Sequence, residues 1–418
     1  MTTLIIVGQG YVGLPLASGA VRARIKVIGL DSSEETVVRL NAGESHVDDI
    51  NDAELIAMLK SGYSATTDPK VIAGADVVVI CVPTPMEDGG RPDLSAIISA
   101  ANAIADNLTP NTLVVLESTT YPGTTTDLVL PILLRSGLAL DEDFHLAFSP
   151  ERIDPGNAAY GLRNTPKIVG GVSSLSTKSA YDFYSLLVDS VVVVKGTKEA
   201  ETAKLLENTY RHVNIALVNE MAKFCHELDI DIWEVIGAAS TKPFGFAAFY
   251  PGPGVGGHCI PIDPNYLSYE VERALGYPFR FVELAQEINN SMPRYVVHRI
   301  QDALNDESLS LRGSRVLLLG VTYKANIKDQ RESPAIPIAL ALQAKGALVQ
   351  FHDPRVSSWD LPNASLHREN DLGTAVTNAD IVVLLQNHDE YDADALAGHS
   401  RLFFDCRGAV SDSNAIRL

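Results

Sequence analysis

Short apolar runs recur through the first two hundred residues, rich in Val, Ile and Leu and without strict polar alternation. Strands buried on both faces have this composition, which is typical of a parallel sheet covered by helices. Seven runs predict strands: Leu4–Val7, Lys26–Leu30, Val77–Val82, Leu113–Leu116, Leu146–Phe148, Lys167–Val169 and Val191–Val194. Because longer, helical-looking segments separate the first of these runs, we expect a parallel sheet with helical crossovers.

The pattern changes near residue 197. From about Lys198 to Leu228 the chain has no Pro or Gly, and apolar residues recur at steps of three and four. This spacing predicts one long helix, and further helical segments follow to about Asn305. Strand-like runs then resume at Val316–Leu319, Leu348–Phe351 and Ile381–Leu385.

A glycine motif follows the first predicted strand. In Gly8-Gln9-Gly10-Tyr11-Val12-Gly13 the first glycine allows a tight turn, the second a close approach of backbone to a pyrophosphate, and the third close packing of helix on strand. The following helix offers N–H groups to phosphates. Asp31 ends the second strand, where its carboxylate would bind a ribose diol and repel a 2′-phosphate, favouring NAD over NADP. The alternative is a glycine-rich turn with a solvated Asp.

These observations predict an α/β protein of several domains, since 418 residues exceed what one hydrophobic core usually serves. We expect an N-terminal Rossmann-type parallel sheet domain (1–196) that binds NAD, a central long-helix domain (197–305) and a C-terminal Rossmann-like sheet domain (306–418). The C-terminal runs lack the full glycine fingerprint, so that sheet is expected to bind a different ligand.

Charge and composition exclude several classes of function. The chain has 33 Lys and Arg against 52 Asp and Glu, a net charge of −19 that repels nucleic acid and anionic lipid. No uncharged apolar stretch is long enough to cross a bilayer, and the first residues lack the basic segment of a signal peptide. The four cysteines lie far apart, without zinc spacing, so no metal is predicted. We expect a cytoplasmic protein.

Two loops should complete the NAD pocket, since ligands bind at the carboxyl ends of parallel strands. Thr84 lies in the loop after the Val77–Val82 strand, and Ser118 and Thr119 lie in the loop after Leu113–Leu116.

The candidate nucleophile is Cys259. It closes the segment Pro251-Gly252-Pro253-Gly254-Val255-Gly256-Gly257-His258-Cys259, whose four glycines would let a bulky ligand lie against backbone. A thiolate attacks carbonyls, and oxidation to the acid level benefits from a thioester. Asp263 follows four residues later. Cys81, in an apolar strand, is instead expected to be a small buried side chain.

Polar side chains on the long helix form a second candidate set. Lys204 and Asn208 are four residues apart and share a face, which Arg211 and His212 continue. A lysine can stabilise an alkoxide, and an asparagine can donate to an oxyanion, although such a stripe can also be a solvated face. Candidate cations for an anionic ligand are Lys242, Arg280, Lys324 and Arg331.

Taken together, the motifs resemble those of the UDP-glucose/GDP-mannose dehydrogenase family over essentially the whole chain. The matching blocks are Gly8–Gly13, Val82–Pro85, Glu117–Thr119, Ser149–Arg152, Lys204–Asn219, Gly254–Asp263 and Tyr323–Ser333. The stretches from Thr241 to Gly254 and from Gly257 to Pro264 look most like the UDP-N-acetylhexosamine branch, with UDP-N-acetylglucosamine 6-dehydrogenases as the best match.

The resemblance implies a four-electron oxidation of a sugar C6 alcohol that consumes two NAD. Cys259 would capture the aldehyde, with Lys204 and Asn208 at the oxyanion. Glu151 would be the general base, and Thr119 and Asp263 would position water. The remaining roles are implied in the same way: Arg331 on the cofactor side, and Arg211, Lys242, Tyr250, Gly254, Gly256 and Lys324 toward the substrate.

The resemblance also implies a homodimer built on the central helix, and a UDP-sugar substrate held largely by the C-terminal domain. Two other classes stay open. A β-hydroxyacid dehydrogenase of the 6-phosphogluconate type shares the Lys-x-x-x-Asn pair but uses no cysteine, and an NAD-binding scaffold would need neither Cys259 nor Lys204. Among sugars, UDP-GlcNAc is expected, with UDP-ManNAc, UDP-GalNAc and UDP-glucose as alternatives.

Overall fold

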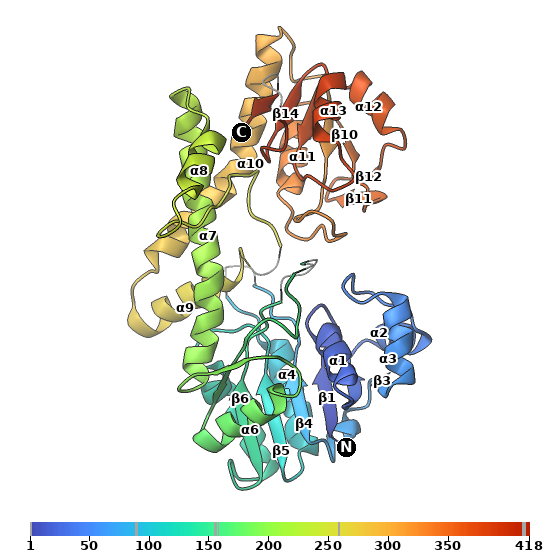
Figure 1. The fold of residues 1–418 in the computed structure, drawn as a ribbon, viewed down its shortest axis with the longest axis vertical. Helices are drawn as coiled ribbons and strands as arrows, with labels where there is room; N and C mark the ends of the chain where they lie inside the picture. The colour runs from blue at the N-terminus through green and yellow to red at the C-terminus, as the bar shows by residue number, and fades with distance from the viewer. Residues whose placement is uncertain (1, 88–90, 154–156, 158, 258–259, 412–414) are drawn as a thin grey trace. The chain divides into compact units, whose positions relative to one another are not determined.

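The structure is a computed structural model that describes residues 2–87, 91–153, 157, 159–257, 260–411 and 415–418. Two compact units make up the chain, Met1–Glu207 with Asn265–Tyr277, and Asn208–Pro264 with Pro278–Leu418. The α/β class is confirmed, with an N-terminal sheet, central helices and a C-terminal sheet (Figure 1).

The first unit contains an eight-stranded sheet in the order β3-β2-β1-β4-β5-β6-β7-β8. Its strands are β1 (Thr3–Val7), β2 (Lys26–Leu30), β3 (Tyr63–Thr66), β4 (Val77–Ile80), β5 (Thr112–Leu116), β6 (Phe144–Phe148), β7 (Lys167–Gly171) and β8 (Val191–Val193). All seven predicted strands are present, although β4 ends two residues and β8 one residue earlier than predicted.

One strand pair departs from the predicted parallel arrangement, since β6 and β7 are antiparallel. A parallel pair needs a crossover that returns the chain to the starting edge of the sheet, usually through a helix. The described residues between β6 and β7 contain no helix, so β7 enters the sheet from the opposite end. Because Phe148 pairs with Gly170, the start of β7 lies past the end of β6, beside the residues that follow β6.

Helices cover both faces of this sheet. Successive residues of β1 belong to opposite cores: Leu4 and Ile6 to one, Ile5 and Val7 to the other. This two-sided burial explains why the strands read as continuous apolar runs. The helical elements that precede α7 in this unit are α1 (Gly13–Arg22), α2 (Glu34–Ala42), α3 (Asp52–Lys60), η1 (Pro69–Ile72), α4 (Ser95–Asn107), η2 (Thr124–Val129), α5 (Leu130–Leu133), η3 (Leu134–Ser136) and α6 (Ser174–Tyr184).

The long central helix is confirmed as α7 (Thr197–Glu227), 31 residues without interruption, or about 46 Å at the usual rise per residue. The other central helices are α8 (Ile232–Ser240), α9 (Asp263–Leu275) and α10 (Arg280–Asp306). No helix among the described residues is both long enough and apolar enough to span a membrane.

The C-terminal sheet has the order β10-β9-β13-β14-β15, and every neighbouring pair is parallel. Its elements are β9 (Arg315–Leu319), α11 (Ala335–Ala344), β10 (Leu348–His352), α12 (Leu372–Asn378), β13 (Ile381–Leu384), α13 (Ala393–His399), β14 (Phe403–Asp405) and β15 (Ile416–Arg417). A separate antiparallel hairpin, β11 (Ser358–Leu361) and β12 (Ala364–His367), follows β10.

Candidate active site

The three glycines after β1 serve different neighbours. A Cβ at Gly13 would lie 1.9 Å from the Gly8 carbonyl oxygen, and one at Gly8 would lie 2.6 Å from that of Cys81. Gly8 also has φ of +94°, which favours glycine. A Cβ at Gly10 would meet nothing within 4 Å. The chain's own backbone therefore requires Gly8 and Gly13, whereas Gly10 faces open space, as a site for a pyrophosphate needs.

The residues around this turn fit an NAD molecule. Val12 is the N-cap of α1 and its side chain makes no capping hydrogen bond; Leu14 N–H donates to the Gly10 carbonyl oxygen at 3.1 Å and Pro15 has no N–H, so the N–H of Gly13 is the candidate donor to an anion. The Asp31 Oδ2 accepts a hydrogen bond from the Gln9 N–H at 2.9 Å, and Oδ1 accepts one from Ser33 at 2.9 Å. An ionised carboxylate has about four acceptor sites, so capacity is left for a diol.

The two predicted loops are joined to each other. The Thr84 hydroxyl donates to the Thr119 carbonyl oxygen at 2.9 Å, and the Ser118 hydroxyl donates to the Val82 carbonyl oxygen at 2.8 Å. The Tyr266 hydroxyl donates to the carbonyl of Thr84. The structure thus brings Thr84, Ser118 and Thr119 together at the carboxyl ends of β4 and β5.

A buried charge cluster surrounds Glu151. Lys167, the first residue of β7, lies with its Nζ 3.0 Å from Glu117 Oε2 and 3.3 Å from Glu151 Oε2. The Tyr184 hydroxyl donates to the other oxygen of Glu117. Sequence reasoning gave Lys167 only a place in a strand, because a buried lysine has no local signal. To predict its contact with Glu151, one would have had to know that β6 and β7 are neighbouring strands.

Two opposing influences act on the Glu151 carboxyl. Burial raises its pKa, but Lys167, two backbone N–H groups and Lys204 together hold the pKa below its usual value. Those N–H groups belong to Arg152 and Ile153 and donate at 2.7 and 2.5 Å. Glu151 is therefore an oriented carboxylate under the field of Lys204, as a water-activating base requires.

In the second unit, Asn208 and Asp263 meet. The Asn208 Nδ2 donates to Asp263 Oδ2 at 2.5 Å, and both side chains are buried. Beyond Asn208 the predicted stripe divides, since Arg211 is exposed whereas His212 is completely buried and burial lowers its pKa to about 4. A helix turns by about 100° per residue, so these two adjacent side chains point in different directions.

The glycine segment packs against the chain itself. A Cβ at Gly256 would lie 2.6 Å from the Glu332 carbonyl oxygen, and one at Gly257 would lie 2.8 Å from the Tyr323 ring. The Gly252 N–H donates to the Asn219 side chain of α7 at 2.9 Å. The backbone proximity predicted for a ligand therefore has another cause at Gly256 and Gly257, namely the segment that contains Tyr323 and Glu332.

Of the cysteines, Cys259 lies outside the described residues, as does His258. Cys81 is buried as predicted, and burial raises the pKa of its thiol well above the ordinary value. Cys225 and Cys406 are also buried and free of disulfides. None of these three has the exposure or the low pKa of a reactive thiolate.

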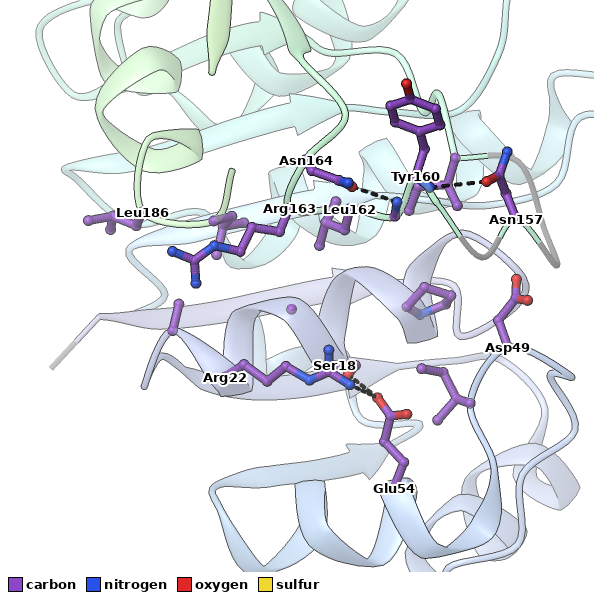
Figure 2. A pocket seen from close by; sticks show the side chains of 17 residues that line it. Ser18, Arg22, Asp49, Glu54, Asn157, Tyr160, Leu162, Arg163, Asn164 and Leu186 are labelled. Carbon is purple, nitrogen blue, oxygen red and sulfur yellow. Dashed lines mark hydrogen bonds and ion pairs between the residues drawn. The ribbon is translucent and has the colours of Figure 1, made fainter. Parts of the chain in front are cut away.

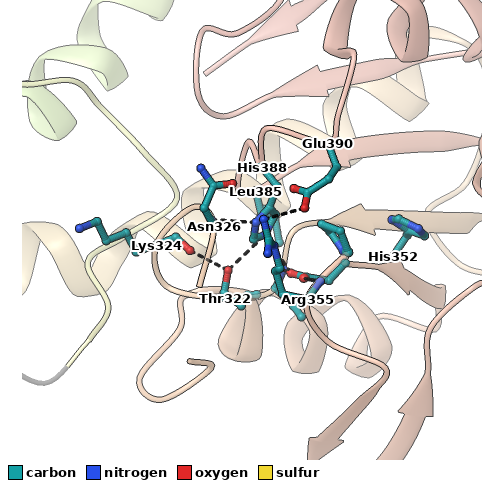
Figure 3. A network of polar contacts seen from close by, with 12 residues as sticks. Thr322, Lys324, Asn326, His352, Arg355, Leu385, His388 and Glu390 are labelled. Carbon is teal, nitrogen blue, oxygen red and sulfur yellow. Dashed lines mark hydrogen bonds and ion pairs between the residues drawn. The ribbon is translucent and has the colours of Figure 1, made fainter. Parts of the chain in front are cut away.

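The predicted cations differ in their surroundings. Lys324 belongs to a loop fixed to buried His388 through Thr322 and Asn326, and its side chain extends away from that cluster (Figure 3). Arg331 pairs with Asp329 at 2.5 Å. Lys242 is exposed, with its Nζ 5.0 Å from the centre of the Phe244 ring.

Two further side chains near the glycine segment, Tyr250 and Arg407, make contacts of their own. Tyr250 stacks on Trp233 with an interplanar angle of 13°. Arg407, which sequence reasoning missed, lies with its Nη1 3.0 Å from the Cβ position of Gly252, and its Nε donates to the Leu385 carbonyl oxygen at 2.6 Å. A lone Arg after a short strand gives no signal in the sequence.

Known proteins match the chain along its whole length. The profiles of the UDP-glucose/GDP-mannose dehydrogenase family match residues 2–188 (NAD binding domain), 198–291 (central domain) and 317–412 (UDP binding domain). The chain belongs to this family. It is thus an NAD-dependent nucleotide-sugar dehydrogenase.

Individual relatives in the family agree. A UDP-N-acetyl-D-mannosamine dehydrogenase of Methanococcus vannielii is 35% identical over 392 residues, covering 92% of this chain and 86% of the relative. An NDP-N-acetyl-D-galactosaminuronic acid dehydrogenase of Ralstonia nicotianae is 36% identical, covering 98% and 96%. The solved UDP-D-ManNAc dehydrogenase of Pyrococcus horikoshii has a TM-score of 0.89 at 30% identity and covers 100% and 98%.

A cavity of about 420 Å³ in the first unit lies away from the family's motifs (Figure 2). Residues of α1, α3 and the 157–164 segment line it, and none of the predicted site residues is among them. Three of the polar side chains that line it are engaged with one another, since Ser18 and Arg22 both donate to Glu54.

Proposed function

We propose that the protein oxidises the C6 alcohol of a UDP-N-acetylhexosamine to the carboxylate through a thioester on Cys259. The observation that carries this proposal is the buried, oriented Glu151 carboxylate under the field of Lys204. A thioester must be hydrolysed, so the reaction needs a base for water, whereas a simple hydroxyacid dehydrogenase does not. Alcohol, two NAD⁺ and water give carboxylate, two NADH and three protons.

In this proposal residues 1–196 hold the cofactor, 197–305 form the central catalytic domain and 306–418 bind the nucleotide of the substrate. NAD, when bound, supplies the hydride acceptor for both oxidations. The residues proposed to hold it are Gly8, Gly10, Tyr11, Val12, Gly13, Asp31, Thr84, Ser118 and Arg331. The open space at Gly10 and the spare acceptor sites of Asp31 support this assignment.

The chain's own groups divide the chemistry between them. Lys204 stabilises charge that develops on the C6 oxygen during the first oxidation. The Cys259 thiolate then bonds to the aldehyde carbon, and Lys204 and Asn208 stabilise the resulting oxyanion. After the second oxidation, water adds to the thioester carbon, its proton passes to Glu151, and the C–S bond breaks to release the thiolate. Thr119 and Asp263 position that water.

The substrate is proposed to contact Arg211, Lys242, Tyr250, Gly254, Gly256 and Lys324. The sequence motifs favoured UDP-GlcNAc with UDP-ManNAc among the alternatives, and the names of several relatives support UDP-ManNAc, which differs from UDP-GlcNAc in the configuration at a single carbon. The proposal covers both sugars, and the substrate experiment below decides between them.

The decisive experiment is a substrate panel. Purified protein with excess NAD and a limiting amount of UDP-GlcNAc, UDP-ManNAc, UDP-GalNAc or UDP-glucose is followed by NADH absorbance to completion. We expect about two NADH per N-acetylhexosamine and little from UDP-glucose. Cys259→Ala should abolish this turnover while NAD binding persists. One NADH per sugar, or turnover by the Ala variant at the normal rate, contradicts the covalent route.

We also propose a homodimer through α7. Three large apolar side chains of this helix, Tyr210, Leu217 and Phe224, are exposed in the second unit, as is Leu228 directly after the helix. Steps of seven, seven and four place them along one side of the helix, the pattern of a face that packs against another. Light scattering of the purified protein should give twice the mass of the 45.0 kDa chain. Leu217→Glu should shift that mass toward the monomer, and a wild-type monomer contradicts the proposal.

A further inference from the structure

Lys167 lies between two buried carboxylates, one of which is the proposed base. We propose that Lys167 is a positioning residue that holds Glu151 ionised, and that Glu117 is the site where the cluster stores a proton. This inference rests on the proposed function of Glu151 only for its effect on turnover. The ionisation of Glu151 itself can be measured without any reaction.

Within the described part of the chain, Glu117 and Glu151 are the ion-pair partners of Lys167. The side chains of Lys167, Glu117 and Glu151 are 3%, 0% and 12% exposed, and the Lys167 Nζ contacts both carboxylates at 3.0 and 3.3 Å. The ends of β5 and β6 and the start of β7 bring the three together. A surface ion pair would be screened by water, but a pair at this depth is not.

The charges of the cluster do not balance when both carboxylates are ionised. One ammonium then faces two carboxylates, and a buried net charge is costly unless one group becomes neutral. The surroundings decide which one. Glu151 has two backbone N–H donors and Lys204 on its side, whereas Glu117 has the hydroxyl of Tyr184. Burial accordingly raises the pKa of Glu117, while the pKa of Glu151 is lowered.

Among the described residues, other titratable groups near Glu151 are Lys204, Cys81 and Arg152. Lys204 on α7 lowers the pKa of Glu151, and Cys81, at the end of β4, feels the charges of the cluster but keeps its proton because it is buried. The Arg152 side chain points to Glu207, at 2.7 Å, and is therefore engaged elsewhere. Lys167 remains the buried cation in direct contact with the base.

A purely structural role makes a different prediction from this one. If Lys167 only balanced charge for folding, removal of either partner would damage the protein in the same way. If it sets the ionisation of Glu151, removal of the cation raises the pKa of Glu151, whereas removal of the competing carboxylate does not. The two substitutions must therefore differ in sign or size.

The experiment compares Lys167→Met, Glu117→Gln and Lys167→Arg in the full chain. Protein labelled with ¹³C at the glutamate side-chain carboxyls is titrated by NMR, and the Glu151 signal is identified by its loss in Glu151→Gln. We expect Lys167→Met to raise the Glu151 pKa by about one unit or more, a tenfold change in proton affinity. Glu117→Gln should leave it unchanged or lower, and Lys167→Arg should restore the wild-type value.

The double variant Lys167→Met with Glu117→Gln guards against a variant that fails to fold, since it removes the buried ammonium together with the carboxyl group that it contacts. It should fold and still show the raised Glu151 pKa. An unchanged Glu151 titration in both Met variants overturns the inference, as does an equal rise in Glu117→Gln alone. If the titration shifts as expected while the acid limb of the turnover profile does not follow it, the inference holds and the role of Glu151 as base fails.

Discussion

The two sheets of the protein share one hydrogen bond: a backbone N–H that follows the first strand donates to an aspartate that follows the second strand. In the N-terminal sheet, the Gln9 N–H donates to Asp31 Oδ2 at 2.9 Å; in the C-terminal sheet, the Val321 N–H donates to Asp353 Oδ2 at 2.8 Å. The second oxygen of each carboxylate accepts an N–H from two residues further on, at 2.9 and 2.8 Å. An acidic residue at the end of the second strand is thus common to both halves.

The difference lies in what else reaches the carboxylate. Asp31 is partly exposed, whereas Asp353 is 0% exposed and lies 3.1 Å from His388 Nε2. The Asn326 N–H donates to His388 Nδ1 at 3.0 Å, so Nε2 carries the proton and can donate to Asp353. The C-terminal sheet uses its buried carboxylate to anchor its own loop, which leaves it unable to bind a ribose diol. Sequence position alone does not make a ribose site.

Of the substitutions that test this comparison, we expect the largest effect at Gly13. Gly13→Ala places a Cβ 1.9 Å from the Gly8 carbonyl oxygen, so the N-terminal turn must shift. Overpacking strain of about 3 kcal/mol in the binding turn corresponds to a loss of NAD affinity on the order of 100-fold, measurable by calorimetry. Gly10→Ala is the matched control, because its Cβ meets nothing within 4 Å. It should melt like wild type yet bind NAD more weakly, and unchanged binding would place the pyrophosphate elsewhere.

Substitution of Asp31 and Asp353 tests whether the two carboxylates have different roles. Asp353→Asn removes a buried acceptor of charge-assisted hydrogen bonds, so we expect a loss of about 2–3 kcal/mol in the free energy of unfolding and no direct effect on NAD affinity. Asp31→Asn should leave stability within about 1 kcal/mol but lower NAD affinity about tenfold and relax discrimination against NADP. Urea unfolding and NAD titration of both variants test this, and equal effects of the two would contradict it.

The pH dependence of the Asp353 effect gives a finer test. Burial raises the pKa of Asp353, but His388 and the N–H donors hold it below the usual value. Because the folded pKa is depressed, the stabilisation is present above the unfolded pKa of about 3.9 and is lost as the pH falls through the folded value. The difference between wild type and Asp353→Asn should therefore shrink toward zero in acid. A difference that stays constant would show that the charge is not its origin.

Hydrophobic patterning predicted the sheets well, because strands buried on both faces must be continuously apolar. Val77 to Ile80 in β4 and Leu317 to Leu319 in β9 are examples. The β11–β12 hairpin was not predicted, because its strands mix exposed polar residues with few apolar ones. The antiparallel entry of β7 was not predicted either, since it depends on a connection without a helix in its described part, and strand composition does not encode direction.

The candidate site, like the fold, was predicted only in part from the sequence. Motifs with a fixed spacing, such as Gly8 to Gly13 or Lys204 and Asn208, were found because their chemistry is local in sequence. The partners that set their electrostatics come from distant strands. Lys167 and His388 each act through contacts more than fifteen residues away, and a single lysine or histidine in an apolar context carries no mark of its partner.

Gly256 and Gly257 fit closely against Tyr323, so two segments about 66 residues apart in the sequence limit each other's side chains. A side chain at position 257 would meet the ring at 323 and would also strain a backbone whose φ is +85°, so we expect glycine to be kept at this position across relatives. The glycine signature that helps to identify the branch then records an internal contact, and the preference for one sugar over another has to be encoded at other positions.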